Sequence, residues 1–265
     1  MFQTTLALFG ISIQKQLETR SEFLFERIRA LSILISLYFL WNAVFSGRTT
    51  VMGYTQVQMM TYLFLMTFLR ALVLACVTDR IPSEISRGKI SEILLKPLSH
   101  MKYWAVQDIA NKSLHLISSS VELLIILFII PYPLLGPVDL QGFLAFLVAV
   151  LGGMILYFQM SYALGVMGFW TAQSWGPRFC FEIVLEFCAG AFFPIDVLPL
   201  VAQKILMFTP FPYLVYYPVM LYLGKGTPTL FLQIFSAQIF WILFLGLTLK
   251  WLWHKGLKFY GAEGG

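Results

Sequence analysis

Three acidic residues lie in otherwise apolar stretches of the chain, and their side chains are the best placed to act on a solute. Glu122 lies in one such stretch, and Glu182 and Glu186 lie one helical turn apart in another. An ionisable group at membrane depth is costly, so it usually faces a protein interior or a wet cavity and often marks a transport path. Arg178 has the i, i+4 spacing to Glu182 that favours an ion pair on one helix. Two interpretations therefore stay open for the glutamates: a translocation path or structural ion pairs.

The sequence lacks the usual signatures of catalysis and of metal binding. The pairs Gly88-Lys89 and Gly224-Lys225 lack both the upstream glycine and the following Ser or Thr of a phosphate-binding loop, so we expect no nucleotide hydrolysis by this chain alone. The histidines are scattered, with no pair at the spacing of a helical zinc site. We therefore predict no catalytic residue, no cofactor and no metal. An intramembrane hydrolase or transferase stays open as an alternative that no motif supports.

Composition places the chain in a membrane. Hydrophobic residues make up 59% of it and charged residues only 12%, whereas soluble domains carry about 25% charged residues. The net charge of +5 comes from basic residues in the gaps between apolar runs, where they act as topology signals. We therefore expect no nucleic-acid partner. The odd number of cysteines, within or beside apolar runs, predicts core residues and no disulfide framework.

The apolar runs predict an all-α membrane protein with six transmembrane helices. A span needs about 20 apolar residues, and the candidates are residues 28–45, 55–77, 103–130, 143–171, 179–193 and 230–250. Arg70 lies near the inner end of the second span, within snorkelling reach of water. Residues 1–27 begin with apolar positions at steps of three and four, which predicts an amphipathic helix at the cytoplasmic interface.

The proline-rich stretch 194–226 allows two topologies, and charge decides between them. It could hold a further span, or a re-entrant helical hairpin that enters the outer half of the bilayer and returns. Only the hairpin leaves Lys250, Lys255 and Lys258 in the cytoplasm with most of the other basic residues. We therefore predict the re-entrant hairpin just before the last span, and both chain termini in the cytoplasm.

Residues 79–102 form the most charged loop between two apolar runs. Pro82 suits the first turn of a short helix, and Gly88 suits its end. A second short helix is expected at residues 90–95, with Ile90, Ile93 and Leu94 on one face. Such a face could rest on lipid headgroups or fit a groove in a partner protein.

Four blocks of sequence carry a resemblance to a known family. ISRGKISEILLKPLSH (85–100), GAFFPIDVLP (190–199), PFPYLVYYPVMLYLGK (210–225) and GLKFYGAEGG (256–265) resemble recurring blocks of the ABC-2 type transporter permeases, in a subfamily once catalogued as a domain of unknown function. The resemblance runs nearly end to end, so residues 1–265 would form a single transmembrane domain. It implies an export permease of a bacterial plasma membrane, in contact with the lipid bilayer. A self-sufficient membrane enzyme or channel is the alternative.

The resemblance also implies partners and roles. Two ATP-binding subunits would work with two permease subunits, either a homodimer or a heterodimer with a sister permease. The loop at 79–102 would dock on the ATPase as a coupling helix, and the hairpin would cap the path. The expected coupling residues are Glu84, Ile85, Arg87, Ile90, Glu92, Ile93 and Leu94. Glu122, Glu182 and Glu186 are the candidates for the translocation path, and the substrate stays open among drugs, lipids, lipid-linked material, polymers and peptides.

Overall fold

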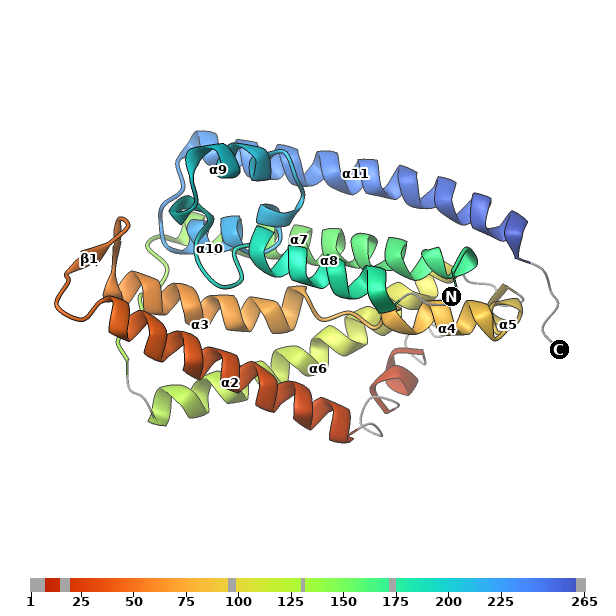
Figure 1. Cartoon of the computed structure of the whole chain (residues 1–265), viewed down its shortest axis with the longest axis horizontal. Helices are drawn as coiled ribbons and strands as arrows, with labels where there is room; N and C mark the ends of the chain where they lie inside the picture. The colour runs from red at the N-terminus through yellow and green to blue at the C-terminus, as the bar shows by residue number, and fades with distance from the viewer. Residues whose placement is uncertain (1–7, 15–19, 95–98, 130–131, 172–174, 261–265) are drawn as a thin grey trace.

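Long helices running along the same axis build the protein (Figure 1). The structure is a computed structural model that describes residues 8–14, 20–94, 99–129, 132–171 and 175–260. Among these residues, the helices long and apolar enough to cross a membrane are Gln56–Val73, His100–Ile129, Leu140–Phe169 and Thr229–Phe259. The predicted class, an all-α membrane protein, is confirmed.

The labelled elements follow one another with short connections. Their order is α2 (Arg20–Val44), β1 (Thr50–Val51), β2 (Tyr54–Thr55), α3 (Gln56–Val73), η1 (Thr78–Arg80), α4 (Ile81–Ser86), α5 (Ile90–Leu94), α6 (His100–Ile129), α7 (Leu140–Val166), η2 (Met167–Phe169), α8 (Trp175–Cys188), η3 (Ile195–Val197), α9 (Leu200–Met207), η4 (Phe211–Tyr213), α10 (Tyr216–Tyr222) and α11 (Pro228–Phe259). Residues 8–14 are also helical. Of the rest of the predicted N-terminal helix, residues 20–27 belong to α2, so the first long helix begins at Arg20 and not at the predicted residue 28. Residues 1–7 and 15–19 lie outside the described residues.

A two-residue β-hairpin, which the sequence analysis did not anticipate, joins α2 to α3. Met52 and Gly53 form its turn, both with positive φ (52° and 78°), as the right-handed twist of a tight hairpin requires. Thr55 then caps α3: its hydroxyl accepts from the backbone N–H of Gln58, and the Gln58 side chain accepts from the N–H of Thr55. This capping box sets the start of α3 where the second span was predicted.

The second span ends earlier than predicted, at Val73 instead of residue 77. The chain leaves the helix beside a buried lysine of α6, because Lys112 donates a hydrogen bond to the carbonyl oxygen of Ala75. A carbonyl that has left the helical ladder needs another donor when it is buried. In contrast, α11 continues to Phe259, past the predicted end at residue 250.

The charged loop folds as the sequence predicts, into two short helices. Pro82 lies in the first turn of α4, and Gly88 ends that helix with a φ of +73°. The apolar side of the loop is turned inward, since Ile81 and Ile90 are fully buried in a cluster with Trp104 and Val166. The loop is therefore packed against the helical body of this chain.

Two glycines allow the loop to lie directly on α7 and η2. A Cβ on Gly165 would lie 2.9 Å from Cδ1 of Ile81, and a Cβ on Gly168 would lie 2.7 Å from Cα of Pro82. Real side chains do not approach so closely, so only glycine fits at either position. These two glycines therefore lie at the contact between the long helix and the charged loop.

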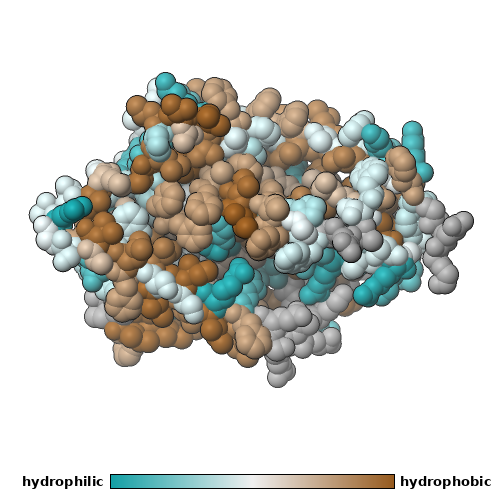
Figure 2. All heavy atoms as spheres, in the orientation of Figure 1, coloured by the Kyte–Doolittle hydropathy of each residue, from teal (hydrophilic) through white to brown (hydrophobic). Residues whose placement is uncertain are grey.

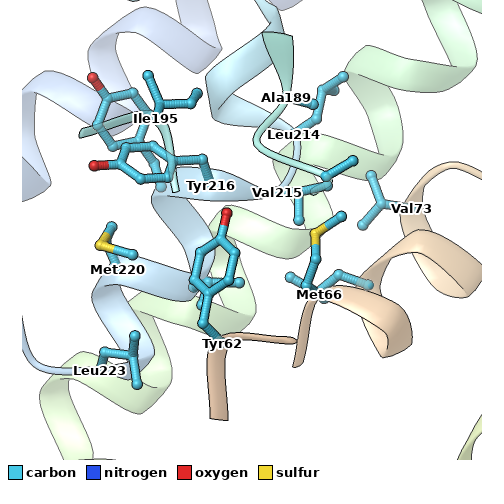
Figure 3. Close-up of a cluster of buried hydrophobic side chains, with 14 of the residues drawn as sticks. Tyr62, Met66, Val73, Ala189, Ile195, Leu214, Val215, Tyr216, Met220 and Leu223 are labelled. Carbon is cyan, nitrogen blue, oxygen red and sulfur yellow. The ribbon is translucent and has the colours of Figure 1, made fainter. Parts of the chain in front are cut away.

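The proline-rich stretch forms a compact group of short helices at the end of the molecule opposite α4 and α5 (Figure 1). Its helix α10 packs against α7, and α9 packs against η3 and η4 of the same group. The hydroxyl of Tyr62 in α3 points toward this group (Figure 3) and donates to the carbonyl oxygen of Gly190 at 2.6 Å. Tyr216 and Met220 belong to the same buried cluster as Tyr62. These contacts fix the group of short helices to the long ones.

Gly168→Ala should destabilise the protein by overpacking the contact between η2 and α4. An added methyl group in a tight contact costs about 1–3 kcal/mol. The measurement is the thermal unfolding midpoint in detergent, followed by tryptophan fluorescence. The matched control is Gly176→Ala, where a Cβ meets nothing within 4 Å. Equal midpoints for the two variants would contradict this description of the loop contact.

Candidate functional site

A polar cavity of about 380 Å³ lies between α2, α3, α7 and α8. Arg178, Glu182 and Glu186 line it from α8, because a spacing of four places them on one face of that helix. Tyr157 of α7 and Asp79 of η1 form another part of the cavity wall. The charged lining also includes Glu26, Arg27, Arg29 and Arg70. The space therefore offers both signs of charge to a solute inside a mainly apolar protein.

Glu186 forms an ion pair with Arg70 of α3 across the cavity. Arg70 was expected to lie within snorkelling reach of water, but it pairs with this half-buried carboxylate instead. Within the described part of the chain, Oε2 of Glu186 and Nη1 of Arg70 have no hydrogen-bond partner. A buried polar atom without a partner is costly, so the ion pair leaves one polar atom of each residue unsatisfied inside the protein.

Glu182 forms the local ion pair that its spacing predicts, with Nε of Arg178 3.3 Å from its Oε1. Arg178 also donates from Nη2 to Oγ of Ser161 in α7 at 2.8 Å. The hydroxyl of Ser161 in turn lies 2.6 Å from Oγ1 of Thr78, a buried residue of η1. Hydrogen bonds thus run without interruption from the start of the charged loop to the cavity wall.

Glu122 lies apart from the other two candidate glutamates. Its Oε2 is 3.5 Å from Nη1 of Arg27 in α2, which also donates to Oγ of Ser119 at 3.1 Å. Nη2 of Arg27 lies 2.8 Å from Nδ1 of His115. Arg27 lines the cavity, whereas Glu122 does not. The three glutamates are therefore divided between the cavity and a network beside it.

The sequence analysis missed a buried ion pair in α6. Nζ of Lys112 lies 2.9 Å from Oδ2 of Asp108, and both side chains are almost completely buried. Their polar face is directed into the protein, and their i, i+4 spacing was the available signal.

The face of the charged loop that points away from the body is polar. Arg87, Lys89 and Glu92 are exposed, Glu84 is half-buried, and Ile85 and Ile90 are buried. The side chains of Ile93 and Leu94 lie outside the described residues. Figure 2 shows the same contrast, with a hydrophilic end over α4 and α5 and mostly apolar surface at the other end.

The end of α11 holds the loop from the other side. The hydroxyl of Tyr260 donates to the carbonyl oxygen of Gly88 at 2.8 Å, and Oγ of Ser91 lies 2.9 Å from the same hydroxyl. Gly88 is the residue at which α4 ends, so this contact fixes the corner between the two short helices. The loop is thus tied to α7 on one side and to α11 on the other.

No group of His, Cys, Asp and Glu that could hold a metal ion occurs among the residues that the structure describes. Two arginine–carboxylate pairs, Arg70 with Glu186 and Arg178 with Glu182, line the cavity. Such pairs bind and orient polar solutes, and their position between apolar helices is typical of a transport protein. The fold and the cavity thus define a multi-pass membrane protein with a charged interior space.

Comparison with protein families identifies this class more closely. The model of the ABC-2 family transporter proteins matches residues 31–264, so the chain belongs to the ABC-2 transporter family. It is a membrane permease of an ABC transporter. Membership in this family implies that the chain lies in a lipid bilayer and works with an ATP-binding partner subunit. Comparison with curated proteins found no match.

Glu186→Ala should destabilise the protein because it leaves the charge of Arg70 without its partner. Loss of a partner for a part-buried charge costs about 1–3 kcal/mol. The thermal unfolding midpoint in detergent measures this loss, and the exposed Glu92→Ala is the control. The double variant Arg70→Gln with Glu186→Gln should recover part of the loss, since no uncompensated charge remains. A Glu186→Ala midpoint equal to that of the control would show that the ion pair does not stabilise the fold.

Proposed function

We propose that this chain forms the translocation path of an ATP-driven exporter and that a separate subunit supplies ATP hydrolysis. One observation carries the proposal: hydrogen bonds join the charged loop to the wall of the charged cavity through Thr78, Ser161 and Arg178. A loop that docks on an ATPase needs such a connection, because force applied at the loop must change the shape of the path. Family membership supports the transporter class.

In the proposed topology, six helices cross the bilayer. They are the four long apolar helices together with α2 and the shorter α8. Residues 194–226 form the re-entrant hairpin, which occupies the part of the bilayer thickness that the short α8 does not cross. The segment before α2 forms the interface helix, and 79–102 form the cytoplasmic coupling loop. Both termini lie in the cytoplasm, and the membrane is a bacterial plasma membrane.

The proposed transporter contains two permease subunits and two ATP-binding subunits. The permeases are either two copies of this chain or one copy with a sister permease. The exposed polar side of the loop, with Arg87 and Glu92, contacts the ATPase. Ile85 and Ile90, which are buried, anchor the loop so that its movement reaches α7. Glu84 lies between these two faces, and Ile93 and Leu94 continue the predicted docking segment.

We assign the path itself to the charged cavity. Glu186 and Arg70 line it as an ion pair, and Glu182 lies on the same face of α8. Glu122 acts on the path only through Arg27, which contacts both Glu122 and the cavity. A shift of η1 transmitted through Ser161 would move Arg178 and so change the pairing of Glu182. That change alters the cavity without breaking the packed core.

Reversing the charges of the exposed loop, with Arg87→Glu and Glu92→Lys together, should weaken the contact with the ATPase. We expect at least a tenfold loss of transport-coupled ATP hydrolysis in the purified complex, because mismatched charges at an interface oppose docking. The control is Lys204→Glu, which reverses the charge of an exposed lysine in α9, outside the coupling loop. Complex formation and coupled hydrolysis at the wild-type level would overturn the docking role of this face.

Ser161→Ala should uncouple hydrolysis from transport while the complex still assembles. It removes the hydroxyl that joins Thr78 to Arg178, so we expect basal ATP hydrolysis to persist and transport to fall about tenfold, the rate equivalent of about 1.4 kcal/mol. The control is Ser236→Ala, whose exposed hydroxyl bonds only within its own helix, to the carbonyl of Gln233. A parallel loss of hydrolysis and transport would indicate a general structural defect, and unchanged transport would exclude the proposed connection.

A further inference from the structure

A second cavity, of about 570 Å³, lies at the opposite end of the molecule. The short helices α9, η4 and α10 and the beginning of α11 surround it. Most of its wall is apolar or aromatic, with Met207, Phe208, Tyr213, Tyr216, Tyr217 and Ile234. Its volume lies within the range of about 300–1,000 Å³ typical of small-molecule sites. The wall suits a chain or ring of hydrocarbon.

One basic side chain lines this cavity. Nζ of Lys225 lies 3.2 Å from the ring centroid of Tyr54, a fully buried residue of β2. Among the described residues, no acceptor lies within hydrogen-bond distance of this ammonium group, although it has three donors. Burial lowers the pKa of Lys225, and the nearby Asp196 opposes that shift. The ammonium group is thus partly shielded from water without gaining a hydrogen-bonded anion.

The neighbouring carboxylate is already engaged. Oδ2 of Asp196 accepts a hydrogen bond from the Tyr54 hydroxyl at 2.5 Å. Asp196 is exposed, so water screens its negative charge. Gln203 fixes the adjoining wall, because its amide nitrogen donates to the carbonyl oxygens of Asp196 and Leu198. The donors of Lys225 therefore remain available to a ligand, beside a mainly apolar chamber.

We propose that this cavity binds an anionic amphiphile, with its carboxylate or phosphate group on Lys225 and its hydrocarbon part against the aromatic wall. The same chemistry would be met by the head and chain of a membrane lipid or by a single-chain amphiphile in transit. The site consists of residues of this chain alone. It does not depend on the partner ATPase or on the coupling mechanism.

The test is native mass spectrometry of the full chain in a neutral detergent. The probes are palmitate and hexadecyl phosphate, and hexadecanol is the neutral control of equal chain length. We expect the two anions to bind at least tenfold more tightly than hexadecanol. Lys225→Gln should lower the affinity for each anion about tenfold, because a charge-assisted hydrogen bond is lost. Lys225→Arg should retain the wild-type affinity.

The control variant is Lys204→Gln, which removes an exposed lysine of α9 that does not line the cavity. Equal losses in the two glutamine variants would indicate nonspecific attraction to surface charge and would overturn the proposal. Met207→Trp keeps Lys225 and narrows the chamber at a half-exposed position, so it should weaken binding of both anions. Anion binding that neither Lys225→Gln nor Met207→Trp alters would also overturn it.

Competition identifies the source of the ligand. If phosphatidylglycerol displaces hexadecyl phosphate, the site accepts a two-chain membrane lipid. If it does not, the site selects a single-chain amphiphile. Both outcomes keep the anion on Lys225, and they separate a lipid site from a site for a transported molecule.

Discussion

The structure depends on one constraint: a charge placed among apolar helices must be paired inside the protein. Arg27 with Glu122 joins α2 to α6, and Arg70 with Glu186 joins α3 to α8. Lys112, paired with Asp108, also binds the chain just after α3. An isolated charge in such surroundings is far more costly than a pair. These ion pairs therefore determine which helices are neighbours around the cavity, and they give the cavity its charged walls.

The same constraint links the cavity to the charged loop. Arg178 satisfies Glu182 on its own helix and still has donors for Ser161, which contacts Thr78 at the start of the loop. Glycines at the surface of α7 and η2 let the loop lie close enough for this contact. Close packing and hydrogen bonding thus occur at the same contact, between the loop and α7. A displacement of the loop therefore reaches the cavity over a short distance.

Much of the fold could be predicted from the sequence because its signals are local. Apolar runs predict most of the long helices, and Pro82 and Gly88 predict the first short helix of the loop and its end. The pair of Arg178 with Glu182 follows from helical spacing. The partners of Glu122 and Glu186 could not be predicted this way, because Arg27 and Arg70 lie 95 and 116 residues away in the sequence. The early end of α3 likewise depends on a lysine from another helix.

The most direct measurement of the central claim is ATP hydrolysis by this protein purified in mild detergent from its native host, with the co-purifying chains identified. An ATP-driven permease predicts that a nucleotide-binding subunit accompanies the chain and that the preparation hydrolyses ATP. A pure chain that shows no hydrolysis in several detergents and retains no partner would contradict the claim. It would instead favour a self-sufficient channel or membrane enzyme built around the same charged cavity.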